Sequence, residues 1–164
     1  MRNAILLATA VLVLVLVNVG IRQREDLITS GRTVLLELAP VDPRSLMQGD
    51  YMALRFQAAN DAFPHGNVEG LKDGHIVLAV DPRNVGTFRR FANGGLAADE
   101  VLLRYRIRNG QPKFATNAFF FQEQHGNFYQ GARYGEFRVD AEGEALLVAL
   151  RGKELQVLGP PGGG

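Results

Sequence analysis

The stretch MQGDYMALRF, residues 47–56, decides the fold that the sequence predicts. Its apolar side chains recur at every second position, at Met52, Leu54 and Phe56. That period is typical of a strand with one face against a core. The preceding Gly-Asp pair is typical of a turn, because glycine accepts unusual φ values and a short carboxylate accepts backbone N–H bonds. The stretch therefore predicts a turn that leads into a half-buried strand.

The two-residue period dominates from about residue 33 onward. We expect strands at residues 33–38, 51–56, 75–80, 87–92 and 117–121, and hairpins over residues 101–114 and 134–150. Residues 58–74 are rich in Ala, Asn, Asp, Gly and Pro, which favours a long surface connection. Residues 122–133 are expected to hold one helical turn.

The two hairpins carry the clearest local signals. In the first, Asn109-Gly110 suits a type I′ turn, and Pro112 places the returning strand at a sheet edge. In the second, Phe137 and Val139 are expected to pair toward three apolar residues of the returning strand. Those residues are Leu146, Val148 and Leu150.

The N-terminal segment has a different pattern. Residues 4–21 carry no charge, and a helix of that length spans about 27 Å, close to the hydrocarbon core of a bilayer. We therefore expect an uncleaved signal-anchor that contacts the lipid bilayer through residues 4–21. The predicted fold class is mainly β, with a single N-terminal transmembrane helix and one compact antiparallel β-rich domain. Its parts are the anchor (1–24), a tether (25–32), the β-rich domain (33–158) and a disordered tail (159–164).

Composition excludes several function classes. The chain has 164 residues and no cysteine, which leaves no disulfide and no thiolate chemistry. Three of its 18 basic residues lie before residue 25, so residues 25–164 carry 15 basic and 17 acidic side chains. That balance gives no reason to expect nucleic-acid binding. His65, His75 and His125 have no metal-ligand spacing, and we expect neither a metal nor another cofactor.

The stretch GDYMALRF resembles the signature of the GDYXXLXY family of membrane-anchored bacterial proteins. Gly49, Asp50, Tyr51 and Leu54 match, and Phe56 stands in place of the final tyrosine. The segments APVDPRSLMQ (39–48) and ARYGEFRVDAEGEALLVALRG (132–152) also resemble the family, so the similarity spans roughly residues 34–158. The resemblance implies an extracytoplasmic domain with no established activity. We therefore expect a single-pass protein of the bacterial inner membrane, N-terminus inside, with residues 25–164 in the periplasm.

Two groups of residues are candidates for function. The signature residues are expected to be structural, with Asp50 capping the turn. Arg104, Arg106 and Arg108 share one strand face. They form either a stripe that contacts anionic lipid headgroups or an acidic partner, or an ordinary solvated face balanced by carboxylates of the neighbouring strand.

No catalytic template fits the sequence. Ser45 precedes a Gly-Asp pair, as in signal-peptidase-like proteases, but Lys72, Lys113 and Lys153 lack the strand setting of a buried base. The sequence favours a non-enzymatic accessory or binding module for an integral-membrane protein or an envelope ligand. The alternative is a cell-envelope hydrolase, distantly like the signal-peptidase strand architecture, that uses Asp50 with neighbours such as Tyr51, His125 or Arg133.

Overall fold

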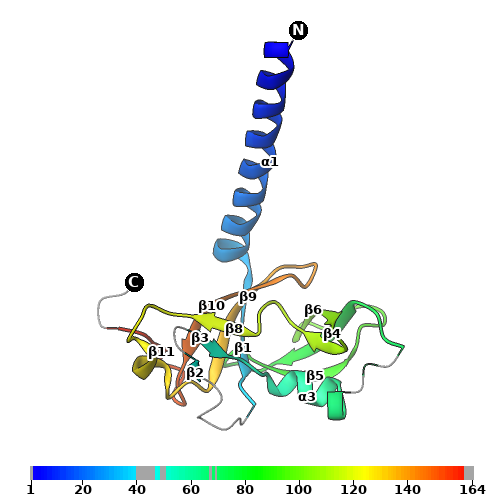
Figure 1. Ribbon diagram of the computed structural model, residues 1–164. Helices are drawn as coiled ribbons and strands as arrows, with labels where there is room; N and C mark the ends of the chain where they lie inside the picture. Colours follow the sequence, from blue (N-terminus) through cyan, green and yellow to red (C-terminus); the bar gives the residue numbers. More distant parts are fainter. Residues whose placement is uncertain (1, 40–46, 49–50, 67, 69, 161–164) are drawn as a thin grey trace.

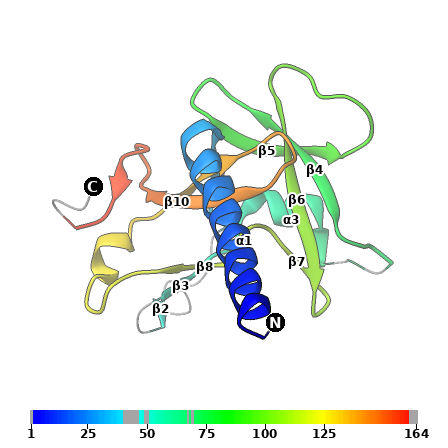
Figure 2. The ribbon, with the colours of Figure 1, turned by 90° about the horizontal axis from the view of Figure 1, so that it is seen from above.

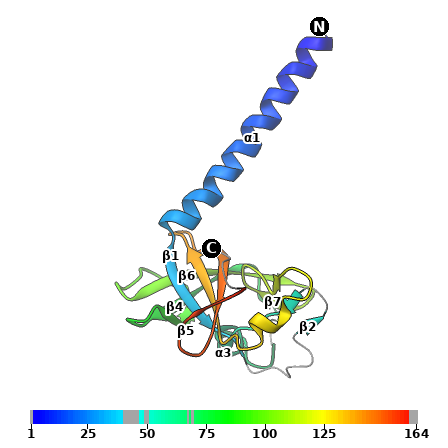
Figure 3. The same cartoon turned by 90° about the vertical axis from the view of Figure 1, so that its left-hand side faces the viewer.

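The computed structural model describes residues 2–39, 47–48, 51–66, 68 and 70–160. Helix α1 (Arg2–Ser30) projects away from a β domain that holds the other described elements (Figure 1, Figure 3). The helix runs through most of the predicted tether. At its end, the Gly31 N–H donates to the Leu27 carbonyl oxygen at 3.0 Å. A Cβ at Gly31 would overlap that oxygen, so the change from helix to strand requires glycine here.

The expected membrane crossing is wrong. A helical crossing takes about 20 predominantly apolar residues. No helix within the described residues combines the length and the apolarity that a crossing requires. Residues 4–21 are helical, but this finding overturns the predicted transmembrane helix. It also overturns the predicted single-pass location in the inner membrane with residues 25–164 in the periplasm.

An eight-stranded sheet forms the body of the β domain. Its spatial order is β11 (Val157–Leu158), β10 (Ala145–Arg151), β9 (Tyr134–Val139), β1 (Arg32–Glu37), β5 (Val85–Phe91), β4 (Gly74–Val80), β6 (Glu100–Arg108) and β7 (Gln111–Lys113). A smaller sheet has the order β2 (Met47–Gln48), β3 (Tyr51–Ala53) and β8 (Ala118–Phe120). The short helices are α3 (Gln57–Ala62) and the 3₁₀ turns Pro64–Gly66 and Gly126–Tyr129.

The large sheet is mixed, which differs from the expected antiparallel arrangement. Strands β1 and β5 pair in parallel, with Leu35 opposite Val85 and Leu36 opposite Gly86. Parallel neighbours require a long crossover connection. Here the chain leaves β1, forms β2, β3, α3 and β4, and returns as β5. The remaining pairs of described strands are antiparallel.

The large sheet curls until its two halves meet. The Arg104 N–H of β6 donates to the Gly143 carbonyl oxygen of the β9–β10 turn at 2.8 Å. Figure 2 shows this turn reaching β6. Gly143 has a φ of +83°, and a Cβ there would lie 3.1 Å from atoms of both His75 and Leu102. The contact between the two halves therefore depends on a glycine in the turn.

The curled sheet encloses one apolar core, and the predicted inward face of residues 51–56 is confirmed. Met52, Leu54 and Phe56 are 2–3% exposed, whereas Arg55 between them is exposed. The Phe56 ring packs edge-to-face on Phe137 of β9, with centroids 5.3 Å apart. The stretch 51–56 thus attaches the small sheet to the large one.

The first hairpin is confirmed, and the predicted surface connection is wrong in its first part, whereas the described residues 64, 66 and 70–73 are exposed. Asn109 and Gly110 have φ values of 53° and 68°, and β7 with Pro112 lies at the end of the large sheet. Residues 58–74, by contrast, include most of α3, whose Ala58 and Ala62 are buried. Two alanines four positions apart give a helix a small apolar face, a signal that the polar composition of the segment concealed.

The second hairpin forms, but the predicted inward face of its returning strand is partly wrong. A bulge between Leu147 and Ala149 shifts the register of β10 against β9. Before the bulge Leu147 packs on the core, and after it Leu150 is fully buried. Val148 is 37% exposed, because the extra residue of a bulge interrupts the alternation of faces.

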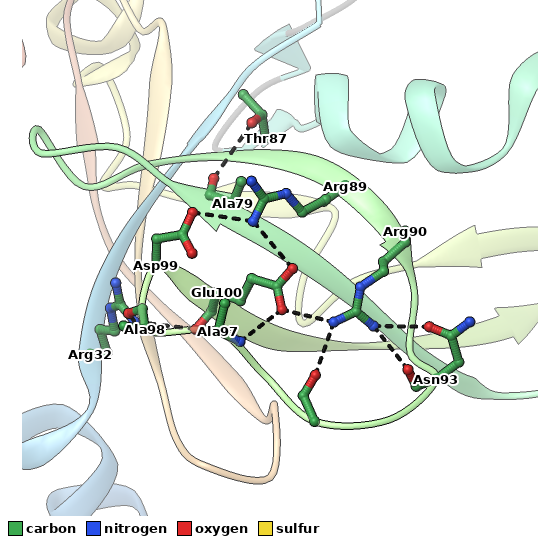
Figure 4. A network of polar contacts seen from close by, with 11 residues as sticks. Arg32, Ala79, Thr87, Arg89, Arg90, Asn93, Ala97, Ala98, Asp99 and Glu100 are labelled. Carbon is green, nitrogen blue, oxygen red and sulfur yellow. Dashed lines mark hydrogen bonds and ion pairs between the residues drawn. The ribbon is translucent and has the colours of Figure 1, made fainter.

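A buried carboxylate ties β5 to β6 (Figure 4). The Glu100 side chain is 5% exposed and accepts hydrogen bonds from the Ala97 N–H at 3.0 Å, Arg90 at 2.8 Å and Arg89 at 3.3 Å. The bond from Ala97, followed by those from the two arginines, lowers the pKa of Glu100. Because these charges satisfy one another, we interpret the network as part of the framework of the sheet.

The first prediction concerns the signature leucine. Leu54→Ala should lower the free energy of unfolding by about 2–5 kcal/mol, because it removes a core side chain that is 2% exposed. The exposed neighbour provides the control, and Arg55→Ala should change stability by no more than about 0.5 kcal/mol. Urea unfolding followed by circular dichroism measures both. Equal losses in the two variants would contradict the assigned faces.

The second prediction concerns the Glu100 network. A lowered carboxyl pKa contributes stability above the ordinary value of about 4.3, and this contribution is lost as the pH falls through the lowered value. Glu100→Gln should therefore melt at a lower temperature than the wild type at about pH 7, with a smaller further decrease at about pH 3. Asp99→Asn is the matched control, since the Asp99 side chain is 54% exposed. If the melting temperatures of wild type and Glu100→Gln fall by the same amount between these two pH values, the assignment is refuted.

Candidate functional site

A cleft of about 770 Å³ lies beside the C-terminal half of α1, between the β6–β7 hairpin, β8 and the start of β10. We call it the basic cleft, because five of its lining residues are cationic and one is anionic. They are Arg24, Arg104, Arg106, Arg108 and Lys113, with Glu144 as the acid.

The three arginines predicted from the sequence all line this cleft. Arg104 and Arg106 both pair with Glu144, which precedes β10, and the distance from Arg106 is 3.3 Å. Arg108 makes two hydrogen bonds to Asp73, at 2.9 and 3.0 Å. The sequence analysis expected carboxylates from the neighbouring strand to balance the stripe. Only Asp73 fits that expectation, because it immediately precedes β4, the strand next to β6. Two guanidinium groups therefore share a single carboxylate at Glu144.

Two titratable groups, Asp73 and Tyr105, have shifted pKa values. The hydrogen bond from Arg108, followed by that from the Ile107 N–H, lowers the pKa of the Asp73 carboxyl. Burial, with a smaller contribution from the charge of Asp73, raises the pKa of the Tyr105 phenol. Both groups therefore keep their usual charge at neutral pH, and Arg108 is held by an ionised partner.

Two cations of the cleft have no acidic partner among the described residues. Arg24 lies on α1 and Lys113 on β7, and both are exposed. The sequence analysis placed neither at a site, although Lys113 lies directly opposite Arg106 in the hairpin that Asn109-Gly110 predicts and so shares its sheet face. The hairpin register brings Lys113 to the cleft, and the direction of α1 brings Arg24 there. Their positive charge is available to a ligand.

The described signature residues lie in and beside the core. Gly49 and Asp50 fall outside the described residues, as does Ser45. Tyr51 is half-buried, and its ring lies 5.9 Å from that of Phe120 on the paired strand β8. Leu54 and Phe56 are core side chains.

The other residues considered for hydrolysis lie in loops. His125 packs on Phe128, with ring centroids 5.6 Å apart. Arg133 bonds through its backbone to Leu38 and Arg151, just before β9. Within the described part of the chain, no cluster of three His, Asp or Glu side chains could hold a metal ion.

Three comparisons with known proteins bear on identity. No curated protein and no solved structure matches the chain. A family model described as GDYXXLXY protein matches residues 13–150, which is most of the sequence. The match includes the signature stretch, the arginine stripe and both predicted hairpins. The chain belongs to the GDYXXLXY protein family.

Proposed function

We propose that the protein is a non-enzymatic binding module that docks on an acidic surface of a larger protein. The observation that carries this proposal is the basic cleft, in which five cations face one lining carboxylate. If the Asp73 carboxylate is taken to neutralise Arg108, the cleft still carries more positive than negative charge. Guanidinium groups and carboxylates form strong, directional pairs, so an acidic protein segment is the partner chemistry that fits the cleft.

Helix α1 supports the same proposal. Its apolar side chains are widely exposed, for example Leu7 at 69% and Leu16 at 63%. Contiguous exposed apolar surface marks a contact site for another molecule. We propose an integral-membrane protein as the partner class, because such proteins combine apolar surface with charged segments outside the bilayer. The hydrolase alternative is supported by no observation on the described residues.

The third prediction tests partner binding. Affinity purification from detergent-solubilised cells should recover a polytopic membrane protein in stoichiometric amount with the tagged wild type. The double variant Arg24→Glu/Lys113→Glu should recover about tenfold less, because it reverses the two cations that have no acidic partner among the described residues. Quantitative mass spectrometry of the eluates gives the ratio.

The matched control is Arg55→Glu/Lys153→Glu, which changes the net charge equally at two exposed positions outside the cleft. It should recover the partner as well as the wild type does. Recovery of the tagged protein by itself, or equal loss in both double variants, would contradict a docking role for the cleft.

A further inference from the structure

The walls of the basic cleft are strand edges. Ala118, Phe119 and Phe120 of β8 all line it, and so do the consecutive residues from Glu144 to Leu147 at the start of β10. Successive side chains of a strand point to opposite faces. A run of consecutive residues therefore lines one cavity only where the cavity borders the backbone edge of the strand.

Both edges lack a strand partner among the described residues, but on β8 the Thr116 hydroxyl already bonds both the N–H and the carbonyl oxygen of Ala118. Strand β8 is the last strand of the small sheet and pairs with β3 on one side. Strand β10 pairs with β9 on one side, whereas β11 covers only Leu150 and Arg151 on the other. Residues 145–149 thus present an open edge. Such edges offer a row of N–H and C=O groups that an extended chain can pair with.

The charge on the cleft has a spacing that suits an extended peptide. Arg104, Arg106 and Arg108 recur at every second residue of β6, so their Cα atoms are about 7 Å apart. Side chains on one face of an extended peptide have the same spacing. Arg24 and Lys113 extend the positive surface onto α1 and β7. A single phosphate or headgroup is too small to contact cations distributed over three elements.

We propose that the basic cleft binds an extended acidic segment of a partner protein as an added β-strand on the open edge of β10, with β8 forming another wall of the cleft. The inference rests on the proposed binding function and specifies its ligand and its mode. Main-chain hydrogen bonds to the strand edge provide affinity, and alternate carboxylates that contact the cations provide selectivity. Phe120, which is 74% exposed on β8, gives an apolar contact beside the charged ones.

The fourth prediction tests strand addition with a defined probe. The probe is a fluorescein-labelled ten-residue peptide of alternating glutamate and valine, titrated with the full chain in a mild non-ionic detergent. Fluorescence anisotropy should show saturable binding. N-methylation of alternate backbone amides in the peptide removes hydrogen-bond donors and keeps every charge, so it should weaken binding by about tenfold or more. The same peptide with lysine in place of glutamate should not bind.

Protein variants separate the two parts of the proposal. Arg24→Glu/Lys113→Glu should weaken binding of the glutamate peptide by about tenfold, and Arg55→Glu/Lys153→Glu should leave it unchanged. Strand addition is overturned if the N-methylated peptide binds the wild type as tightly as the parent peptide does and Arg24→Glu/Lys113→Glu weakens binding of both peptides. Charge-dependent docking would survive that result. If no acidic peptide binds but a partner is still captured through the cleft, the ligand class is wrong and the binding function stands.

Two further occupants would overturn the inference. Binding to phosphatidylglycerol vesicles, without binding to the glutamate peptide, would assign the cleft to a lipid surface. A stable dimer in light scattering that the cleft variant dissociates, again without peptide binding, would assign the open edge of β10 to a second copy of this chain.

Discussion

The hydrogen bond between the Arg104 N–H and the Gly143 carbonyl oxygen is the contact on which the remaining features of the cleft depend. It joins two parts of the large sheet that are distant in the strand order, so the sheet curls around one core instead of staying open. The same contact brings Glu144, the next residue along the chain, to Arg104 and Arg106. Because Gly143 needs a positive φ and has little space for a Cβ, this turn constrains both the curl of the sheet and the charge of the cleft.

The cleft and the Glu100 network show two different uses of arginine in one domain. Arg89 and Arg90 converge on a carboxylate that is almost completely buried, and the Ala97 N–H completes its hydrogen bonding. A buried charge of this kind must be paired to be tolerated. The arginines of the cleft are roughly half exposed, and exposed ion pairs contribute little to stability. Their concentration around one cavity is therefore not explained by folding alone.

Local patterns predicted most of the strands and their turns. The alternation at residues 51–56 identified three core side chains, and Asn109-Gly110 identified the turn between β6 and β7. The bulge at Val148 was missed, because no residue type there distinguishes an extra residue from a regular strand. The parallel pairing of β1 with β5 was also missed, since the pattern of a strand does not state which strand lies beside it.

The candidate site was predictable only in part, for the same reason. The arginine stripe is visible as a two-residue period, but its pairing with Glu144 joins residues about 40 positions apart. Lys113 could have been placed from the predicted turn, which sets it opposite Arg106, whereas the position of Arg24 depends on the direction of α1, which no short motif records. A periodic pattern identifies the face of an element, whereas a binding site requires the relative placement of several elements.

The basic cleft also provides a reason why the open edges do not pair indiscriminately. Unpaired edges invite association with any extended chain, and proteins limit this with short edge strands, bulges, proline and inward-pointing charge. Strand β8 has three residues, β10 carries a bulge, and Pro112 lies in the adjacent hairpin. Because cations surround these edges, a neutral or basic strand would enter at the cost of unpaired or repelled charge. An acidic strand neutralises the cations as its backbone pairs, so the features that protect the edges also select the segment that we propose binds at β10.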